Sequence, residues 1–241
     1  MEYAPNDTLR KILDSVKSQD PNEYWNDTAK LIDIYGIAAG MEYLHSHDII
    51  HRDLKPENIY HNDDMFPKIS GFDISKIIDK TKNTEYKEKI KGTPAYIAPE
   101  IYNKCEYSKS SDVYAFSLIM YEILTGHRPY YEFHSAKEIS HEIINKGTRP
   151  SFDIPIGTSY RKLIERCWSQ EPNERPTFSE IVQLLRTDSS FITDTIDETS
   201  YHEYIQYIDN YPVSFNSNIH VQELDDIMKF KIHTFPDIDI K

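Results

Sequence analysis

The residues best suited to chemistry lie in one polar stretch at positions 51–58, HRDLKPEN. A carboxylate at Asp53, a lysine at Lys55 and an amide at Asn58 can converge when the backbone loops. The carboxylate can then receive a proton, the lysine can neutralise developing negative charge, and the amide oxygen can bind a hard cation. A chance charged loop explains any three of these residues. Eight in this order, followed by a hairpin, favour a functional loop.

Hydrophobic spacing predicts the elements that position this stretch. Helices are expected over residues 9–16 and from about 28 to 45, ahead of it in the chain. Apolar pairs on either side of an acidic turn predict a small hairpin within residues 59–69. Residues 75–95 are polar and lysine-rich with little periodicity, which indicates a functional loop.

Four helices are expected in the second half of the chain. Residues 112–124 are apolar nearly all round, so this helix should be buried at the centre of the fold, and Gly126 should end it. Capping boxes at 135–138 and 177–180 mark two helix starts, and an amphipathic helix is expected over 160–167. The sequence therefore predicts a mainly α domain of the α+β class with a minor β element.

These motifs resemble the protein kinase family over roughly residues 2–186. The HRDLKPEN stretch matches the family's catalytic loop, and residues 92–100, GTPAYIAPE, resemble the segment that ends in the Ala-Pro-Glu motif. Asp112 stands where the family aspartate braces the catalytic-loop backbone. Arg175 stands where an arginine pairs with the glutamate matched by Glu100. The resemblance implies the fold of a kinase C-lobe with its small catalytic-loop hairpin.

The resemblance also implies roles for single residues. Asp53 would orient a substrate hydroxyl and accept its proton, Lys55 would contact the transferred phosphoryl group, and Asn58 would hold a second magnesium ion. Thr93 would hydrogen-bond into the Asp53–Lys55 pair, while His51 is expected to be a structural packing residue. The implied cofactors are ATP and Mg²⁺, and the implied partner is a protein substrate in signalling.

Arg52 would pair with a phosphorylated residue of the activation segment. The candidates are Thr81, Thr84 and Tyr86, and a plain solvated loop is the alternative reading for each. Lys55 and Thr93 favour serine/threonine specificity. Because the Cys-Trp and Arg-Pro pairs near the end of the C-lobe are shared with tyrosine kinases, the mixture is most similar to the tyrosine-kinase-like group.

The motif Gly71-Phe72-Asp73 departs from the family, which has Asp-Phe-Gly at this spacing from the catalytic loop. The family aspartate binds the magnesium that bridges the ATP phosphates, and glycine supplies no ligand. Metal coordination tolerates errors of only tenths of an ångström, so Asp73 is not expected to replace it. The loss should cost several kcal/mol of transition-state stabilisation, or roughly 10³-fold in rate.

A second departure is that no G-x-G-x-x-G loop and no Val-Ala-Ile-Lys strand occurs in the sequence. The resemblance begins at residues 2–4, which look like the hinge between lobes, so the N-lobe is expected to be absent. One hypothesis is a serine/threonine-type kinase that is inactive as an isolated lobe. The others are a pseudokinase or interaction module and a truncated gene product without catalysis.

The composition sets limits on partners and compartment. The chain has 241 residues with 27 Lys+Arg and 40 Asp+Glu, and the net charge of −13 argues against nucleic-acid binding. Residues 188–241 hold 11 acids and 3 lysines, so an acidic tail is expected after a partial kinase domain at 2–187. One apolar helix face is expected within this tail, formed by Tyr201, Tyr204, Ile205 and Ile208.

The two cysteines, Cys105 and Cys167, lie 62 residues apart and form no CxxC motif, so no disulfide is expected. No signal peptide is readable at the N-terminus, and no apolar run approaches the roughly 18 residues of a membrane span. The sequence therefore predicts a cytoplasmic protein that does not bind a membrane.

Overall fold

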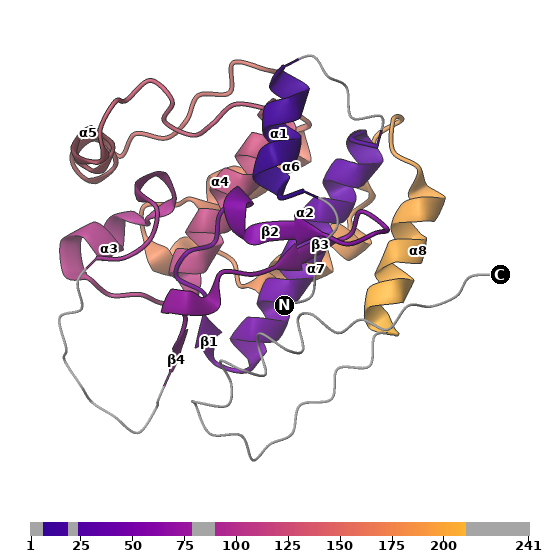
Figure 1. The fold of residues 1–241 in the computed structure, drawn as a ribbon, viewed down its shortest axis with the longest axis horizontal. Coiled ribbons are helices and arrows are strands. Elements are labelled where there is room, and N and C mark those ends of the chain that lie inside the picture. The colour runs from indigo at the N-terminus through magenta and orange to yellow at the C-terminus, as the bar shows by residue number, and fades with distance from the viewer. Residues whose placement is uncertain (1–6, 19–23, 79–89, 211–241) are drawn as a thin grey trace.

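The computed structural model describes residues 7–18, 24–78 and 90–210, in which helices pack on one another (Figure 1). The helices are α1 (Leu9–Lys17), α2 (Asp27–Ser46), α3 (Pro99–Lys104), α4 (Lys109–Thr125), α5 (Ala136–His141), α6 (Thr158–Cys167), α7 (Phe178–Thr187) and α8 (Glu198–Asp209). Short 3₁₀ turns lie at Pro56–Asn58, Phe72–Ile74, Pro94–Tyr96, Pro172–Glu174 and Ser189–Phe191, and a π-helical turn, Glu142–Lys146, follows α5. The described chain is mainly α, as the sequence predicts.

Four short strands form two separate antiparallel pairs. They are β1 (Ile49–Ile50) with β4 (Lys76–Ile77), and β2 (Ile59–His61) with β3 (Pro67–Ile69). The β2–β3 pair confirms the predicted hairpin, with Tyr60 opposite Lys68. The HRDLKPEN stretch runs from β1 to β2, and the backbone nitrogen of Ser70 donates to the carbonyl of Asn58 at 2.8 Å. The hairpin therefore brings the end of this stretch beside Gly71.

Helix α4 is the buried centre of the fold. Apolar residues lie on every side of it, and all of its residues but Lys109, Ser110 and Leu124 are buried. It begins slightly earlier than predicted because Ser108 and Ser111 form a reciprocal capping box. Gly126 ends it in a left-handed conformation at φ 69°, as expected of a C-terminal glycine.

Local signals predict the other helices well, with one exception. Ser135 accepts a hydrogen bond from the backbone of Glu138, and Thr177 and Glu180 cap each other reciprocally. The exception is α3, a six-residue helix that begins at Pro99 and is too short to show a periodic pattern. The expected loop over 75–95 contains β4 and the turn at Pro94–Tyr96, while residues 79–89 lie outside the described residues.

Helix α8 packs against α2, although it follows the end of the kinase resemblance (Figure 1). Tyr201 and Tyr204 are buried and meet the ring of Tyr35 on α2 edge-on, with centroid distances of 5.8 and 6.2 Å. Tyr204 also contacts Phe66 next to the β2–β3 hairpin at 4.5 Å. The predicted apolar face is thus confirmed, and packing continues beyond residue 187. A domain boundary at that residue stays a prediction.

Two further expectations, on the cysteines and on membrane-spanning helices, are compared with the described residues alone. Cys105 and Cys167 are free thiols, and burial raises the pKa of Cys167. None of the helices in residues 7–18, 24–78 and 90–210 is long and apolar enough to cross a membrane.

Replacing Tyr204 by alanine should lower the free energy of unfolding by about 3–5 kcal/mol, because it empties the space between α8, Tyr35 and Phe66. Tyr24→Ala is the matched control, since Tyr24 is 70% exposed and its loss should cost no more than about 0.5 kcal/mol. Urea unfolding measures both. Equal, small costs would show that α8 does not dock as described.

Candidate active site

The carboxylate of Asp112 fixes the backbone at the start of the HRDLKPEN stretch. Its two oxygens accept hydrogen bonds from the backbone nitrogens of His51 at 2.8 Å and Arg52 at 3.0 Å. Nε2 of His45 lies 2.9 Å from the same carboxylate. Arg52 adopts a left-handed backbone at φ 73°, which is costly for a residue other than glycine and needs such support. The bracing expected of Asp112 is therefore confirmed.

His51 is buried beneath the HRDLKPEN stretch and supports it through hydrogen bonds of its ring. Its Nε2 donates to the carbonyl of Ser70 at 2.7 Å, and its Nδ1 accepts from the backbone nitrogen of Asp53 at 3.3 Å. One ring nitrogen donates and the other accepts, which defines a neutral imidazole. Burial lowers the pKa of His51, against the opposing charge of Asp112. His51 is thus a packing residue, as the sequence analysis expects.

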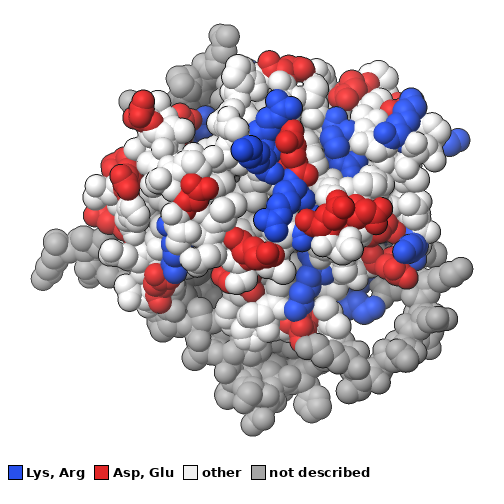
Figure 2. Space-filling model, turned by 180° about the vertical axis from the view of Figure 1, so that it is seen from behind, with Lys and Arg blue, Asp and Glu red and all other residues white. Residues whose placement is uncertain are grey.

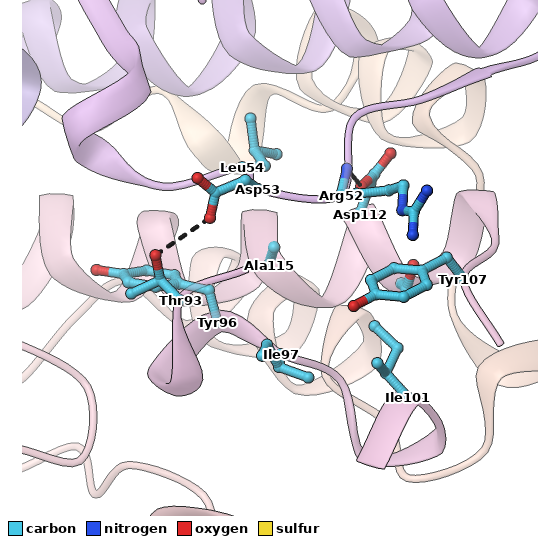
Figure 3. A pocket seen from close by; sticks show the side chains of 11 residues that line it. Arg52, Asp53, Leu54, Thr93, Tyr96, Ile97, Ile101, Tyr107, Asp112 and Ala115 are labelled. Atoms are coloured by element: carbon cyan, nitrogen blue, oxygen red, sulfur yellow. Dashed lines mark hydrogen bonds between the residues drawn. The ribbon is translucent and has the colours of Figure 1, made fainter. Parts of the chain in front are cut away.

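Asp53, Lys55 and Thr93 meet beside a hollow of about 290 Å³. Nζ of Lys55 lies 2.7 Å from Oδ2 of Asp53 and donates to Oγ1 of Thr93 at 2.8 Å. Thr93 in turn donates to Oδ1 of Asp53 at 3.1 Å, a hydrogen bond drawn in Figure 3. The predicted contact of Thr93 with the pair is confirmed. The arrangement offers a carboxylate that can accept a proton next to an ammonium that can stabilise an anion.

Asn58 also serves Asp53. Its Nδ2 donates to the backbone carbonyl of Asp53 at 2.7 Å and to Oδ2 of the side chain at 3.2 Å. The carboxylate of Asp53 therefore receives donors from Thr93, Lys55 and Asn58. Because the amide nitrogen is engaged, the side-chain oxygen of Asn58 is the atom left to bind a ligand.

Gly71 stands directly against the side chain of Asn58. It has φ 81°, a left-handed conformation that favours glycine, and a Cβ built on it would lie 2.4 Å from Cγ and Nδ2 of Asn58. Close-packed carbon atoms do not approach to this distance. Asn58 thus fills the space in which any side chain at position 71 would stand. Asp73 lies two residues later, exposed on the turn Phe72–Ile74, and lines the same hollow.

Arg52 turns away from the hollow and packs on a residue that the sequence analysis missed. Its guanidinium lies 4.2 Å from the ring centre of Tyr107, and Figure 3 shows the two side chains together, on the opposite side of Asp112 from Asp53 and Thr93. Tyr107 precedes the buried helix α4 in a short polar loop. No periodic pattern could have marked it, because only the fold brings this loop to the HRDLKPEN stretch, called the catalytic stretch below.

Glu100 and Arg175 form a bidentate ion pair. Nη1 and Nη2 of Arg175 donate to the two carboxylate oxygens of Glu100 at 2.7 and 2.8 Å, and Nη1 also donates to the carbonyl of Ser110 at 3.0 Å. The side chain of Arg175 is fully buried. This confirms the expected pairing, which ties the end of the Ala-Pro-Glu segment to the region before α7.

A second buried ion pair was not predicted from the sequence. Arg10 on α1 makes a bidentate contact with Glu122 on α4 at 2.7 and 3.1 Å, and it donates to Glu57 at 2.8 Å. Its Nη2 also donates to the hydroxyl of Tyr96, which itself donates to Glu122. Burial raises the pKa of Glu122, whereas Arg10 opposes that rise. Arg10 therefore ties α1 to the catalytic stretch, the 94–96 turn and the central helix.

Comparison with known proteins agrees with this geometry. The family model of protein tyrosine and serine/threonine kinases matches residues 1–185. The chain belongs to the protein kinase family. It is 34% identical over 186 residues to a probable serine/threonine-protein kinase of Dictyostelium discoideum, and 33% identical over 186 residues to a dual-specificity protein kinase of that organism. It is 36% identical over 186 residues to a putative serine/threonine-protein kinase/receptor of Acanthamoeba polyphaga mimivirus.

These matches cover most of the kinase chain but little of each relative. They include 77%, 76% and 76% of this chain and 14%, 36% and 11% of the respective relatives. The chain therefore corresponds to one part of much longer proteins.

The residues at the kinase hollow do not fit the magnesium site that the family implies. Gly71 offers no ligand, its neighbour Asn58 leaves no room for one, and Asp73 is exposed. Asn58 and Asp73 both line the hollow and carry side-chain oxygens, but Asp73 stands on an exposed turn.

Thr81, Thr84 and Tyr86, the candidates for phosphorylation, lie outside the described residues.

Figure 2 shows the face behind the view of Figure 1, where Lys and Arg side chains lie interspersed with Asp and Glu side chains. This face carries both signs of charge, whereas a nucleic-acid-binding face needs a continuous basic field.

Gly71→Ala should lower the free energy of unfolding by about 1–3 kcal/mol more than Gly126→Ala does. Both glycines have positive φ, but a Cβ at Gly126 would meet nothing within 4 Å. The control therefore isolates backbone strain from the contact with Asn58. Adding Asn58→Ala to Gly71→Ala should recover part of the loss. Equal costs for the two glycine variants, measured by urea unfolding, would refute this account of the space at position 71.

Arg10→Met should cost about 3–5 kcal/mol of folding free energy because it leaves the carboxylate of Glu122 buried without its partner. Lys11→Met is the neighbouring control, since the Lys11–Asp7 pair is exposed and should contribute no more than about 1 kcal/mol. The double variant Arg10→Met/Glu122→Leu should be more stable than Arg10→Met alone. Thermal and urea unfolding measure these stabilities. A double variant less stable than Arg10→Met would contradict the argument that the unpaired charge of Glu122 causes the loss.

Proposed function

We propose that residues 2–187 form the C-lobe of a serine/threonine-type protein kinase that binds a hydroxyl-bearing protein segment but transfers phosphoryl groups from ATP slowly or not at all. One observation carries this proposal: position 71 is a glycine that packs on Asn58 at the hollow and supplies no carboxylate for a metal. Residues 188–241 would follow as an acidic tail, of which the first part is packed as α8.

The binding half of the proposal rests on Asp53, Lys55 and Thr93. The carboxylate of Asp53 can hold a serine or threonine hydroxyl and accept its proton, and the ammonium of Lys55 lies 2.7 Å away to stabilise negative charge. Lys55 and Thr93 support serine/threonine rather than tyrosine specificity and a place in the tyrosine-kinase-like group. The relatives named above are serine/threonine and dual-specificity kinases, which supports the same substrate class.

The weak-catalysis half rests on the missing metal ligand. Phosphoryl transfer depends almost entirely on positioning and on neutralising charge, for which the family uses ATP-bound magnesium. A site without a carboxylate at position 71 gives up several kcal/mol of that stabilisation. An interaction module or pseudokinase is therefore the function we favour for the hollow as it stands, with a protein partner in signalling. The free thiols of Cys105 and Cys167 support a reducing, cytoplasmic location.

An active enzyme is the competing function, and one observation favours it. Asp73 lines the same hollow as Asp53 and Asn58, so a rearranged loop could bring its carboxylate to a metal. The exposed position of Asp73 on a short 3₁₀ turn argues against this, because metal ligation needs a side chain held within tenths of an ångström.

The chain should show no saturable rise in melting temperature on addition of Mg²⁺-ATP. Ligand at 100 times its dissociation constant stabilises a protein by about 2.7 kcal/mol, so real binding would be evident. Differential scanning fluorimetry with Mg²⁺ alone, ATP alone and both together makes the measurement.

The variants Asn58→Ala and Asp73→Ala separate the competing functions. A saturable shift with Mg²⁺-ATP that Asn58→Ala removes would contradict the proposal and favour the enzyme. A shift that disappears only in Asp73→Ala would assign the metal to Asp73. We expect that Mg²⁺-ATP leaves the melting temperature of each protein unchanged, in the parent and in both variants.

A further inference from the structure

Two tyrosine hydroxyls hold the chain around Thr93 from outside the hollow. The hydroxyl of Tyr107 donates to the carbonyl of Lys91 and accepts from its backbone nitrogen, both at 2.6 Å. The hydroxyl of Tyr102 donates to the carbonyl of Pro94 at 2.8 Å. Lys91 and Pro94 lie on either side of Thr93, and the double contact of Tyr107 with one residue's backbone imitates the pairing of two strands.

The other end of Tyr107 contacts the catalytic stretch. Its ring lies under the guanidinium of Arg52 at 4.2 Å, and the backbone of Arg52 is fixed by Asp112 on α4 (Figure 3). Tyr107 therefore bridges a rigid part of the fold and Lys91. The contact uses only the backbone of Lys91, so it does not depend on which side chain occupies that position.

Gly92 transmits the position of Lys91 to Thr93. It has φ 103°, and a Cβ on it would lie 3.0 Å from the carbonyl oxygen of Arg52 and 3.8 Å from Oδ1 of Asp53. The backbone at Gly92 thus lies directly against the catalytic stretch. A chain packed this closely has little freedom to shift. The two hydrogen bonds between Tyr107 and the backbone of Lys91, called the tie below, therefore fix where the hydroxyl of Thr93 meets Lys55 and Asp53.

We propose that Tyr107 is a positioning residue whose hydroxyl holds residues 91–93 on the catalytic stretch and so keeps Thr93 in contact with Asp53 and Lys55. Its consequence for ligand binding rests on the proposed function, in which these side chains receive a substrate hydroxyl. The hydrogen bonds between Tyr107 and Lys91 do not depend on the proposed function. Releasing it would leave Asp53 with one donor fewer and free Thr93 to move out of the hollow.

Tyr107→Phe is the test, because it keeps the ring on Arg52 and removes both hydrogen bonds to Lys91. On the ligand-free chain, hydrogen exchange at the Lys91 amide should quicken by roughly three- to tenfold. The γ-methyl NMR signal of Thr93 should shift or broaden. The melting temperature should fall by no more than about 5 °C, since the packing of the ring is unchanged.

Two further variants serve as controls. Tyr131→Phe removes the hydroxyl of a 62% exposed tyrosine and should leave both readouts unchanged. Lys91→Ala should keep the protection of its amide, because the tie uses the backbone. Parent-like exchange and a parent-like Thr93 signal in Tyr107→Phe would overturn the proposal. So would equal changes in Tyr131→Phe, or loss of amide protection in Lys91→Ala.

Both readouts are made without a ligand, so they separate this proposal from the proposed function. If Tyr107→Phe behaves as expected but the chain proves to be an active Mg²⁺-ATP-binding enzyme, the tie stands and the weak-catalysis proposal fails. If Tyr107→Phe behaves like the parent, the tie fails whatever the chain does with ATP.

Discussion

The hydrogen bonds that the carboxylate of Asp112 accepts from the backbone nitrogens of His51 and Arg52 are the constraint on which the rest of the site depends. A buried carboxylate is costly unless its oxygens are satisfied, and here two backbone donors and His45 satisfy them. In return, the carboxylate holds Arg52 in a left-handed conformation that directs the chain onward to Asp53. Because α4 is buried on all sides, this anchor cannot move without disturbing the core.

From that anchor, the polar groups of the hollow are organised around one carboxylate. Thr93, Lys55 and Asn58 all donate to Asp53; Lys55 and Asn58 belong to the same stretch as Asp53, whereas Thr93 comes from a segment 40 residues later. Tyr107 then connects this group to the segment that carries Thr93. Gly71 belongs to the same packed group, because a Cβ at this position would meet the side chain of Asn58 and force it to shift from its contact with Asp53. The donors to Asp53 and the glycine at position 71 thus lie in one packed group of residues.

Buried ion pairs connect the segments that secondary structure leaves separate. Arg10 joins α1 to α4, the 94–96 turn and Glu57, and Arg175 joins the start of α3 to the region before α7. Burying such charges is not in itself stabilising, but removing one partner is expensive. These pairs therefore specify how the segments fit together. Arg175 could be predicted because a family motif marks it, whereas Arg10 lies in an ordinary amphipathic helix with no signal in its sequence.

The sequence by itself determined the helices with strong periodicity or caps, the β2–β3 hairpin and the family, because each depends on local spacing or a contiguous motif. Family motifs also marked Asp53, Lys55, Asn58, Thr93 and Asp112 as the candidate site. The short helix α3, the docking of α8 on α2 and the roles of Tyr107 and Arg10 were decided only by the tertiary structure. Each of these depends on contacts between segments far apart in the chain. The sequence showed that Gly71 lacks a ligand, and only the packed fold showed that Asn58 occupies the space, because that is a property of three-dimensional close packing.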